Sequence, residues 1–215
     1  AGYRRIKIKI KPGWDYDILK LVRQAFPDIT LSVDANSAYT LADINLLKSL
    51  DEFNLLMIEQ PLSHDDIVDH AHLQKQITTD ICLDEPITSL DKTRKAIEMK
   101  SGRIINLKLG RVGGFSEAIK IHNYCNEHNI PVWCGGMLEA GIGRSHNIAM
   151  STLAGFSLPG DVSASKRYFK EDIIEPPVTV SKDGFIKITQ VAGTGYEPKE
   201  EYIERITVRK EVFSA

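Results

Sequence analysis

Short apolar runs alternate along the chain with longer amphipathic stretches. The runs are four to six residues long and rich in isoleucine, leucine and valine, which predicts buried strands at residues 5–10, 31–35, 55–59, 81–84, 104–109, 131–134 and 156–161. Between the runs, apolar residues recur every three or four positions, which predicts helices at residues 16–26, 41–50, 66–77, 90–99 and 116–129. The pattern is therefore a repeated βα unit.

The predicted strands end at a regular interval. Asp34, Glu59, Asp84 and Lys108 mark successive strand ends, separated by 25, 25 and 24 residues. So regular a step favours a TIM-type (β/α) barrel, of fold class α/β, over an irregular open sheet. A doubly wound sheet stays an alternative, but that fold normally carries a glycine-rich nucleotide loop after its first strand, and KPGWD is not such a loop.

The strand count is one short of a closed barrel, because seven strands are predicted where this fold has eight. The chain opens with AGYRRIKIKI, as if a helix ran directly into a strand, so we expect the first strand to be missing and the chain to be a fragment of a longer enzyme. We expect the incomplete barrel over residues 1–168. Residues 169–215 have turn residues and short strand-like runs instead, which predicts a tail that packs on the barrel or on another domain.

Composition and charge exclude several classes of protein. The 215 residues are 42% hydrophobic and 26% charged, as in ordinary globular domains. A net charge of -2 provides no basic field, so no nucleic-acid partner is expected. No apolar run has the length of a membrane span and the N-terminus lacks the apolar core of a signal peptide, so we expect no membrane partner and a cytoplasmic location. An odd number of cysteines without paired spacing predicts reduced thiols.

Three consecutive predicted strands end in a carboxylate. These are Asp34 in VDAN, Glu59 in IEQP and Asp84 in LDEP. A single acidic residue after a strand often caps the following helix. Three at nearly constant spacing, which a barrel would bring to one mouth, favour a site for Mg²⁺, with Mn²⁺ as the alternative.

Lysines occupy the same strand ends. A period of two in IKIKIK puts the isoleucines on one face of a strand and Lys7, Lys9 and Lys11 on the other. Lys108 alternates with apolar residues in the same way in INLKLG. The alternative is a solvated face of an edge strand. Beside the acidic residues, we instead expect Lys7, Lys9 and Lys108 to point into the mouth.

This combination suits the removal of a proton next to a carboxylate. The reaction creates a doubly charged enediolate, which a metal and ammonium groups stabilise as the charge develops. A lysine can act as the base at neutral pH when burial or neighbouring cations lower its pKa. Two lysines on opposite faces of a substrate could also move a proton from one face to the other, as a racemase or epimerase does.

The linked motifs KIKIKPGWD, VDAN, IEQP, LDEP, NLKLGRVGG and VWCGGMLEAGIGRS resemble the o-succinylbenzoate synthase and N-succinylamino acid racemase family of the enolase superfamily. The resemblance runs from about residue 3 to residue 169. It implies that Lys9 is the base and Lys7 its neighbour, that Lys108 acts from the opposite face, and that the metal ligands are Asp34, Glu59 and Asp84.

The resemblance also implies where the substrate binds. Asn36 matches a polar position beside the first ligand, and Gly136, Met137 and Leu138 match a loop that lines the pocket for a succinyl arm. A Gly-Gly turn after a strand can also be simply a turn. Family members carry an N-terminal capping domain and a first barrel strand that are not seen here, and we expect the intact enzyme to be a homo-oligomer.

Several functions are compatible with these residues, all on a small-molecule carboxylate. The first is dehydration of 2-succinyl-6-hydroxy-2,4-cyclohexadiene-1-carboxylate to o-succinylbenzoate, a step of menaquinone biosynthesis, and the second is racemisation of N-succinylamino acids. Both begin with proton abstraction, so the catalytic residues do not separate them. The alternatives are a dipeptide epimerase, a muconate-type lactonizing enzyme, or an inactive barrel fragment that needs a missing segment.

Overall fold

A parallel sheet of six strands forms the centre of the molecule. The computed structural model describes residues 2–213. The strands pair in chain order and all neighbours are parallel. They are β1 (Ile6–Lys9), β2 (Leu31–Asp34), β3 (Ile58–Glu59), β4 (Ile81–Leu83), β5 (Ile104–Leu107) and β6 (Val132–Cys134).

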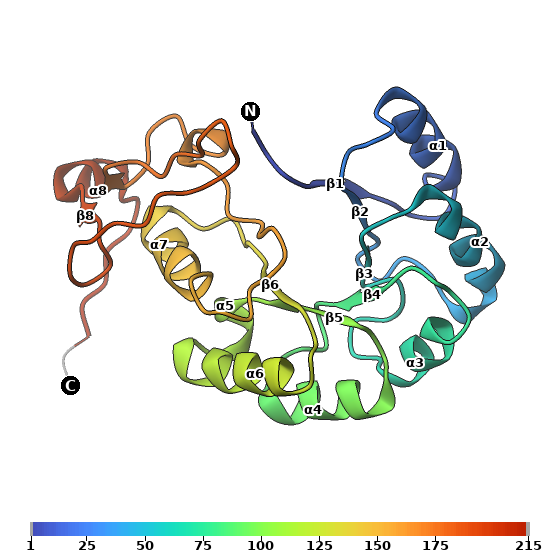
Figure 1. The fold of residues 1–215 in the computed structure, drawn as a ribbon. Helices are drawn as coiled ribbons and strands as arrows, with labels where there is room; N and C mark the ends of the chain where they lie inside the picture. Colours follow the sequence, from blue (N-terminus) through green and yellow to red (C-terminus); the bar gives the residue numbers. More distant parts are fainter. Residues whose placement is uncertain (1, 214–215) are drawn as a thin grey trace.

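The sheet curls into a half-barrel with helices on its outer side (Figure 1). Five of these helices come after the strands as the βα repeat predicts, because their apolar stripes pack against the outer face of the sheet. They are α1 (Tyr16–Ala25), α2 (Ile44–Ser49), α3 (Val68–Gln74), α4 (Leu90–Met99) and α6 (Phe115–Glu127). Short 3₁₀ turns at Leu41–Asp43 and Leu50–Phe53 flank α2. No helix within residues 2–213 is long and apolar enough to cross a membrane.

The seventh predicted strand, residues 156–161, is wrong. This segment runs beside β6 but makes only an isolated parallel bridge between Phe156 and Val132. At its other end the Asp161 N–H donates to the Cys134 carbonyl, at 2.8 Å. Pro159 interrupts the segment, and proline has no N–H to donate to a ladder. The segment therefore runs along the edge of the sheet without becoming a regular strand.

Because side chains alternate along each strand, the two faces of the sheet contact two separate apolar clusters. Residues that point outward, toward the helices, form the main core, and Leu31, Ile58 and Leu83 among them are completely buried. Residues that point inward form a smaller apolar layer of Met57, Cys82, Ile104 and Trp133. The inward residues nearer the C-terminal strand ends are polar, so the polar site rests on this small apolar layer.

Two helices that the periodicity does not predict come after β5 and β6. The short helix α5 (Leu109–Val112) begins directly after Lys108, so the predicted strand 104–109 ends two residues early. The helix α7 (Gly141–Met150) contains two glycines, which are poor helix formers and weaken the pattern. Tertiary packing stabilises α7, because Ile148 lies against Ile174 and Val178 of the C-terminal segment.

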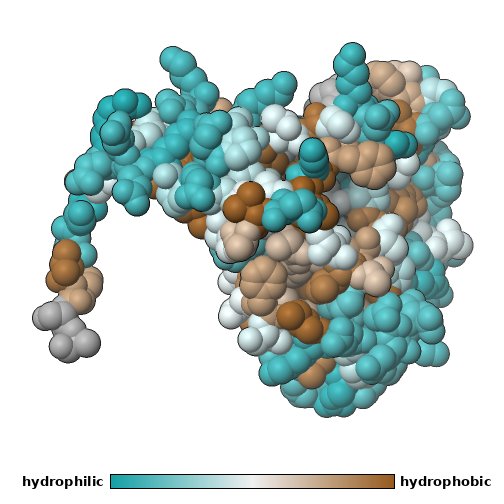
Figure 2. Space-filling model, turned by 60° about the vertical axis from the view of Figure 1, so that its left-hand side comes forward, coloured by the Kyte–Doolittle hydropathy of each residue, from teal (hydrophilic) through white to brown (hydrophobic). Residues whose placement is uncertain are grey.

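The C-terminal segment is mostly irregular. It contains the 3₁₀ turn Ser165–Arg167, a two-stranded antiparallel ribbon of β7 (Ile174–Glu175) and β8 (Glu197–Pro198), and the helix α8 (Glu200–Ile206). Residues 207–213, which follow α8, extend away from the body as an arm (Figure 2). Val208 and Phe213 in this arm are 103% and 87% exposed, so these apolar side chains make almost no contact with the rest of the chain.

Candidate active site

Three carboxylates lie together at the C-terminal ends of three adjacent strands. Asp34 ends β2 and pairs in register with Glu59, which ends β3, and Asp84 comes directly after β4. All three are buried, with exposed fractions of 2%, 0% and 1%. They point inward because they occupy the alternate positions to the core residues Val33, Ile58 and Leu83.

The predicted lysines reach these carboxylates from two sides. Lys9, on β1, donates to Asp34 at 2.6 Å, and Lys108, at the end of β5, donates to Asp84 at 2.7 Å. Lys7 lies deeper, with its Nζ 3.1 Å from Glu59 and 3.3 Å from Asp34. The carboxylates therefore separate Lys9 from Lys108, as two bases on opposite faces of a substrate would require. Lys11 lies outside the cluster, and its backbone forms an isolated antiparallel β-bridge with Trp14.

All six oxygens of the three carboxylates accept a hydrogen bond from the protein. The donors are Lys9 and the Asn36 N–H for Asp34, Lys7 and the Asn106 amide for Glu59, and Lys108 and Arg111 for Asp84. Four of the six are cations, so their charges offset the three buried negative charges, which would be costly without partners.

Burial and neighbouring charges shift the pKa values of the carboxylates in opposite directions. Complete burial raises the pKa of Glu59 to about 7, against the lowering effect of Lys7, and the charges of Asp34 and Asp84 add to the rise. Burial also acts to raise the pKa of Asp34, but the hydrogen bond from Lys9 and the charges of Lys7 and Lys9 outweigh it and lower that pKa. Glu59 therefore binds a proton far more readily than Asp34 does.

Lys7 is a cation held by carboxylates. Burial alone would lower the pKa of Lys7, but the charges of Glu59, Asp161 and Asp34 outweigh burial and raise it above the ordinary value. This is the opposite of the lowered lysine pKa that a pair of lysines beside a metal would produce. Lys7 Nζ also lies 5.3 Å from the centre of the Trp133 ring. With this set of neighbours Lys7 keeps its proton.

The donor set fits a hard divalent cation. Three carboxylates in one layer provide the oxygen ligands that Mg²⁺ prefers, and the Lys7 ammonium already places a positive charge between Asp34 and Glu59. As the side chains stand, no group of three His, Cys, Asp or Glu residues within 2–213 surrounds a common point. Each of the three carboxylates is instead turned toward a lysine or an arginine.

The residues predicted to bind substrate lie at different distances from the cluster. The Asn36 side chain accepts a hydrogen bond from Lys9, which places it at the mouth. Gly136 lies just after β6, and a Cβ there would lie 2.5 Å from the Asp161 carbonyl oxygen, so only glycine fits. Met137 and Leu138 are 54% and 78% exposed. Met137 lines a separate groove of about 410 Å³ between α5 and α7.

Several residues of the site were not predicted from the sequence. Asn106 holds Glu59 at 2.8 Å and shares the inward face of β5 with Lys108, so the period of two could have identified it. Asp161 lies 3.3 Å from Lys7. Arg111 reaches Asp84 because the first turn of α5 returns it to the mouth. Only the tertiary structure reveals these last two contacts.

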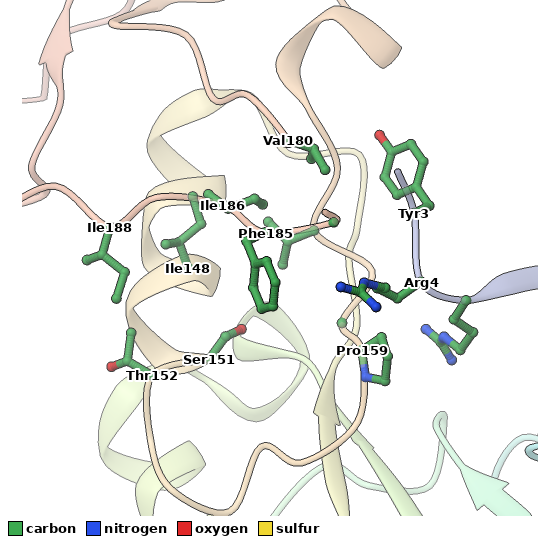
Figure 3. Close-up of a pocket in the computed structure, with 14 residues that line it drawn as sticks. Tyr3, Arg4, Ile148, Ser151, Thr152, Pro159, Val180, Phe185, Ile186 and Ile188 are labelled. Carbon is green, nitrogen blue, oxygen red and sulfur yellow. The ribbon is translucent and has the colours of Figure 1, made fainter. Parts of the chain in front are cut away.

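A well-defined cavity of about 390 Å³ lies beside the candidate site rather than in it. Its walls come from residues 3–5, from α7 and from the C-terminal segment, and Phe185 points into the space between Ile148 and Arg4 (Figure 3). The carboxylates do not line it. Its lining is mainly apolar, so we do not assign it to the chemistry.

Comparison with known proteins reveals extensive similarity. The family model described as enolase C-terminal domain-like matches residues 1–202. An o-succinylbenzoate synthase of Geobacillus kaustophilus is 58% identical over 212 residues, which are 99% of this chain and 56% of that protein. An N-succinylamino acid racemase of Thermus thermophilus is 52% identical over 214 residues, which are 100% of this chain and 58% of that protein. The chain thus spans a little over half the length of these curated relatives.

A solved structure has the same arrangement of elements. The crystal structure of an enolase superfamily member from Listeria innocua superimposes with a TM-score of 0.91 at 48% sequence identity. The superposition covers 95% of this chain and 55% of that chain.

Proposed function

The chain belongs to the enolase C-terminal domain-like family, and from this premise we propose that it carries the acid-base centre of an o-succinylbenzoate synthase, an N-succinylamino acid racemase, or both. The observation that carries the proposal is the placement of Lys9 and Lys108 on opposite sides of three buried carboxylates. The names of the relatives at 52% and 58% identity support it. They also favour these two activities over a dipeptide epimerase or a muconate-type lactonizing enzyme.

In this proposal Asp34, Glu59 and Asp84 hold a divalent metal, with Mg²⁺ favoured and Mn²⁺ as the alternative. When bound, the metal supplies positive charge that stabilises the enediolate. Lys9 and Lys108 exchange a proton with the carbon next to the substrate carboxylate, one from each face. Lys7 stays protonated between Glu59 and Asp161, and its charge further stabilises the anionic intermediate.

The two activities share the proton abstraction and differ in the fate of the intermediate. Racemisation needs both lysines, because one removes the α-proton and the other delivers a proton to the opposite face. Dehydration needs one lysine, which removes the proton as base and then donates it to the hydroxyl group on the neighbouring carbon, so that the C–O bond breaks and water leaves. We propose Asn36, Gly136, Met137 and Leu138 as contacts of the substrate, a small-molecule carboxylate with a succinyl group.

The half-barrel also supports a proposal about the whole protein. We propose that a further segment closes the sheet into an eight-stranded barrel, and that residues 169–215 form a C-terminal tail that packs on the barrel of residues 1–168 or on a capping domain. The exposed apolar arm after α8 suits contact with a capping domain. Assembly as a homo-oligomer and a cytoplasmic location belong to the same proposal.

The proposal can be tested by proton NMR of N-succinylamino acids in D₂O. With Mg²⁺ present, the α-proton signals of both enantiomers are expected to disappear, and a chelator is expected to stop the loss. Lys9→Ala and Lys108→Ala should each stop exchange from one enantiomer. If no exchange occurs with this chain, nor with a form that includes the remaining segments of the relatives, the racemase activity is wrong. If those forms also make no o-succinylbenzoate from 2-succinyl-6-hydroxy-2,4-cyclohexadiene-1-carboxylate, the proposed function as a whole is wrong.

A further inference from the structure

Asn36 lies between Lys9 and a fourth acidic residue, Glu85. The Lys9 ammonium donates to Asn36 Oδ1. On its other side, Asn36 Nδ2 donates to Glu85 Oε1 at 3.2 Å. Glu85 comes directly after Asp84 in the chain and has no assigned part in the metal site. These contacts join three side chains from three different segments into one row.

The backbone at Asn36 is held in an uncommon conformation. Asn36 and Ser37 have φ values of 42° and 65°, and consecutive residues other than glycine rarely adopt the left-handed region. Two hydrogen bonds hold this turn, from the Asn36 N–H to Asp34 Oδ1 at 3.0 Å and from the Ser37 N–H to the Gln60 carbonyl at 2.9 Å. Strained backbone of this kind is retained where the surrounding structure fixes it, often at functional sites.

Glu85 determines which way the Asn36 amide faces. An ionised carboxylate can only accept hydrogen bonds, whereas an amide has a donor end and an acceptor end. With Nδ2 directed to Glu85, Oδ1 must face Lys9. The Lys9 ammonium also only donates, so it requires the same orientation. Without Glu85 the Asn36 N–H groups would lose their acceptor, and the amide would be free to move away from Lys9. Glu85 Oε2 is buried and has no hydrogen-bond partner within residues 2–213, so the Asn36 amide is the group that this carboxylate holds there.

We propose that Glu85 is a positioning residue, which acts through Asn36 to hold the Lys9 ammonium at the mouth of the half-barrel. The inference rests on the proposed function. It would matter most with a metal held by Asp34, Glu59 and Asp84, because the Asp34 carboxylate that accepts from Lys9 at 2.6 Å would then also serve as a metal ligand. Asn36 and Glu85 are outside the proposed metal-ligand set, so their contacts would not compete with the metal.

The opposite lysine has no such support from Glu85. Lys108 is held by Asp84, which also accepts from Arg111. Loss of the Glu85 contact should therefore weaken proton transfer on one face of the substrate only. A substitution that merely loosened the fold would affect both faces.

The first test uses this face-specific difference. The 215-residue chain is supplied with Mg²⁺ and either enantiomer of an N-succinylamino acid in D₂O, and loss of the α-proton signal is monitored by NMR. Glu85→Leu is expected to slow exchange from one enantiomer by about tenfold or more, the size of effect typical for a lost hydrogen bond to a charged group, and to change the other by less than about twofold. Glu85→Gln keeps an acceptor oxygen and should retain most of the rate.

Glu98→Leu is the matched control, because Glu98 is exposed on α4 and pairs only with Arg94 among the residues within 2–213. It should leave both rates unchanged. If Glu85→Leu slows both enantiomers equally, or neither, the positioning role is wrong. If the wild-type chain exchanges neither enantiomer, the proposed function fails for this chain, and the second test decides the positioning role.

The second test does not need activity. The side-chain amide of Asn36 is observed in ¹⁵N-labelled protein and identified by its loss in Asn36→Asp. Its N–H protons should exchange slowly with and without Mg²⁺ in the wild-type chain, and at least about tenfold faster in Glu85→Leu, because the acceptor is gone. Equal exchange in the two proteins would overturn the proposal.

Discussion

At the scale of single residues, Glu59 has the most unusual environment. It is completely buried between a lysine and two other carboxylates, and its pKa is raised from 4.5 to about 7. In the folded protein it therefore keeps a proton at pH values where the unfolded chain has lost it.

This shift predicts a pH dependence of stability. Between pH 4.5 and about 7 the folded state binds more protons at Glu59 than the unfolded state. The contribution of Glu59 to the free energy of unfolding, about 3 kcal/mol in total, is therefore fully present below pH 4.5 and is lost as the pH rises through 7. Urea unfolding of the metal-free protein at pH 5 and pH 8 measures the difference. Glu59→Gln should remove this contribution, and an unchanged pH dependence in that variant would contradict the assignment.

Gly135 is a second unusual residue, because its surroundings leave no room for a side chain. A Cβ there would overlap Asn106 Oδ1 and lie 2.6 Å from Lys108 Cε. Gly135→Ala should therefore displace both the side chain that holds Glu59 and a proposed base. We expect a loss of α-proton exchange on the order of a hundredfold, the cost typical of a misplacement of about 1 Å. Gly110→Ala is the control, because a Cβ there meets nothing within 4 Å. Comparable rates in the two variants would show that the site tolerates the overlap.

At the scale of elements, α4 shows how a change from lysine to glycine can raise or lower the free energy of unfolding, depending on its position. The helix ends at Met99, and the next residue, Lys100, caps it with a φ of 60° and a ψ of 40°, in the left-handed region. Glycine adopts this conformation without the cost that a Cβ imposes. Lys95 lies within the same helix and is about half exposed.

Lys100→Gly should raise the free energy of unfolding by about 0.5–1 kcal/mol, because it relieves the left-handed residue at the helix end. Lys95→Gly should lower it by about 1 kcal/mol, because glycine in a helix interior is unfavourable and the ion pair with Asp91 is lost. Urea denaturation of both variants tests the pair. If the free energy of unfolding changed in the same direction in both variants, position in the helix would not determine the effect of glycine.

At the scale of the whole molecule, the half-barrel has an open edge at β1. The Ile6 N–H donates to the Thr30 carbonyl at 2.9 Å, and the Ile10 N–H donates to the Asp34 carbonyl at 3.0 Å. In a parallel strand, alternate peptide groups point to opposite sides. The peptide N–H groups of Lys7 and Lys9 therefore face the side of β1 that pairs with no strand among the described residues.

Native-state hydrogen exchange should detect this edge. The Lys7 and Lys9 amides are expected to exchange at least about tenfold faster than the Ile8 amide of the same strand, because only the latter faces β2. The Ile81 amide, which is bonded to the Gln74 side chain within the buried sheet, provides the slow reference. Slow exchange at Lys7 and Lys9 would show that another copy or segment covers the edge. A strand that binds there should slow both amides together.

Some features of this protein are determined by the sequence itself. The alternation of isoleucine with Lys7 and Lys9, and the carboxylates at the ends of β2, β3 and β4, predict which side chains share a face. These features are local, since a period of two or 3.6 residues determines which side of an element is buried. For this reason the sequence predicts six strands that the structure contains, and also the polar side chains at their ends.

Only the tertiary structure decided which of these groups meet and how they share charge. The contacts of Lys7 with Asp161, of Arg111 with Asp84 and of Glu85 with Asn36 each join residues that lie far apart in the sequence. They depend on the curl of the sheet and on turns whose conformation no periodicity encodes. Burial, which raises the pKa of Glu59, is likewise a property of the packed molecule rather than of its IEQP motif.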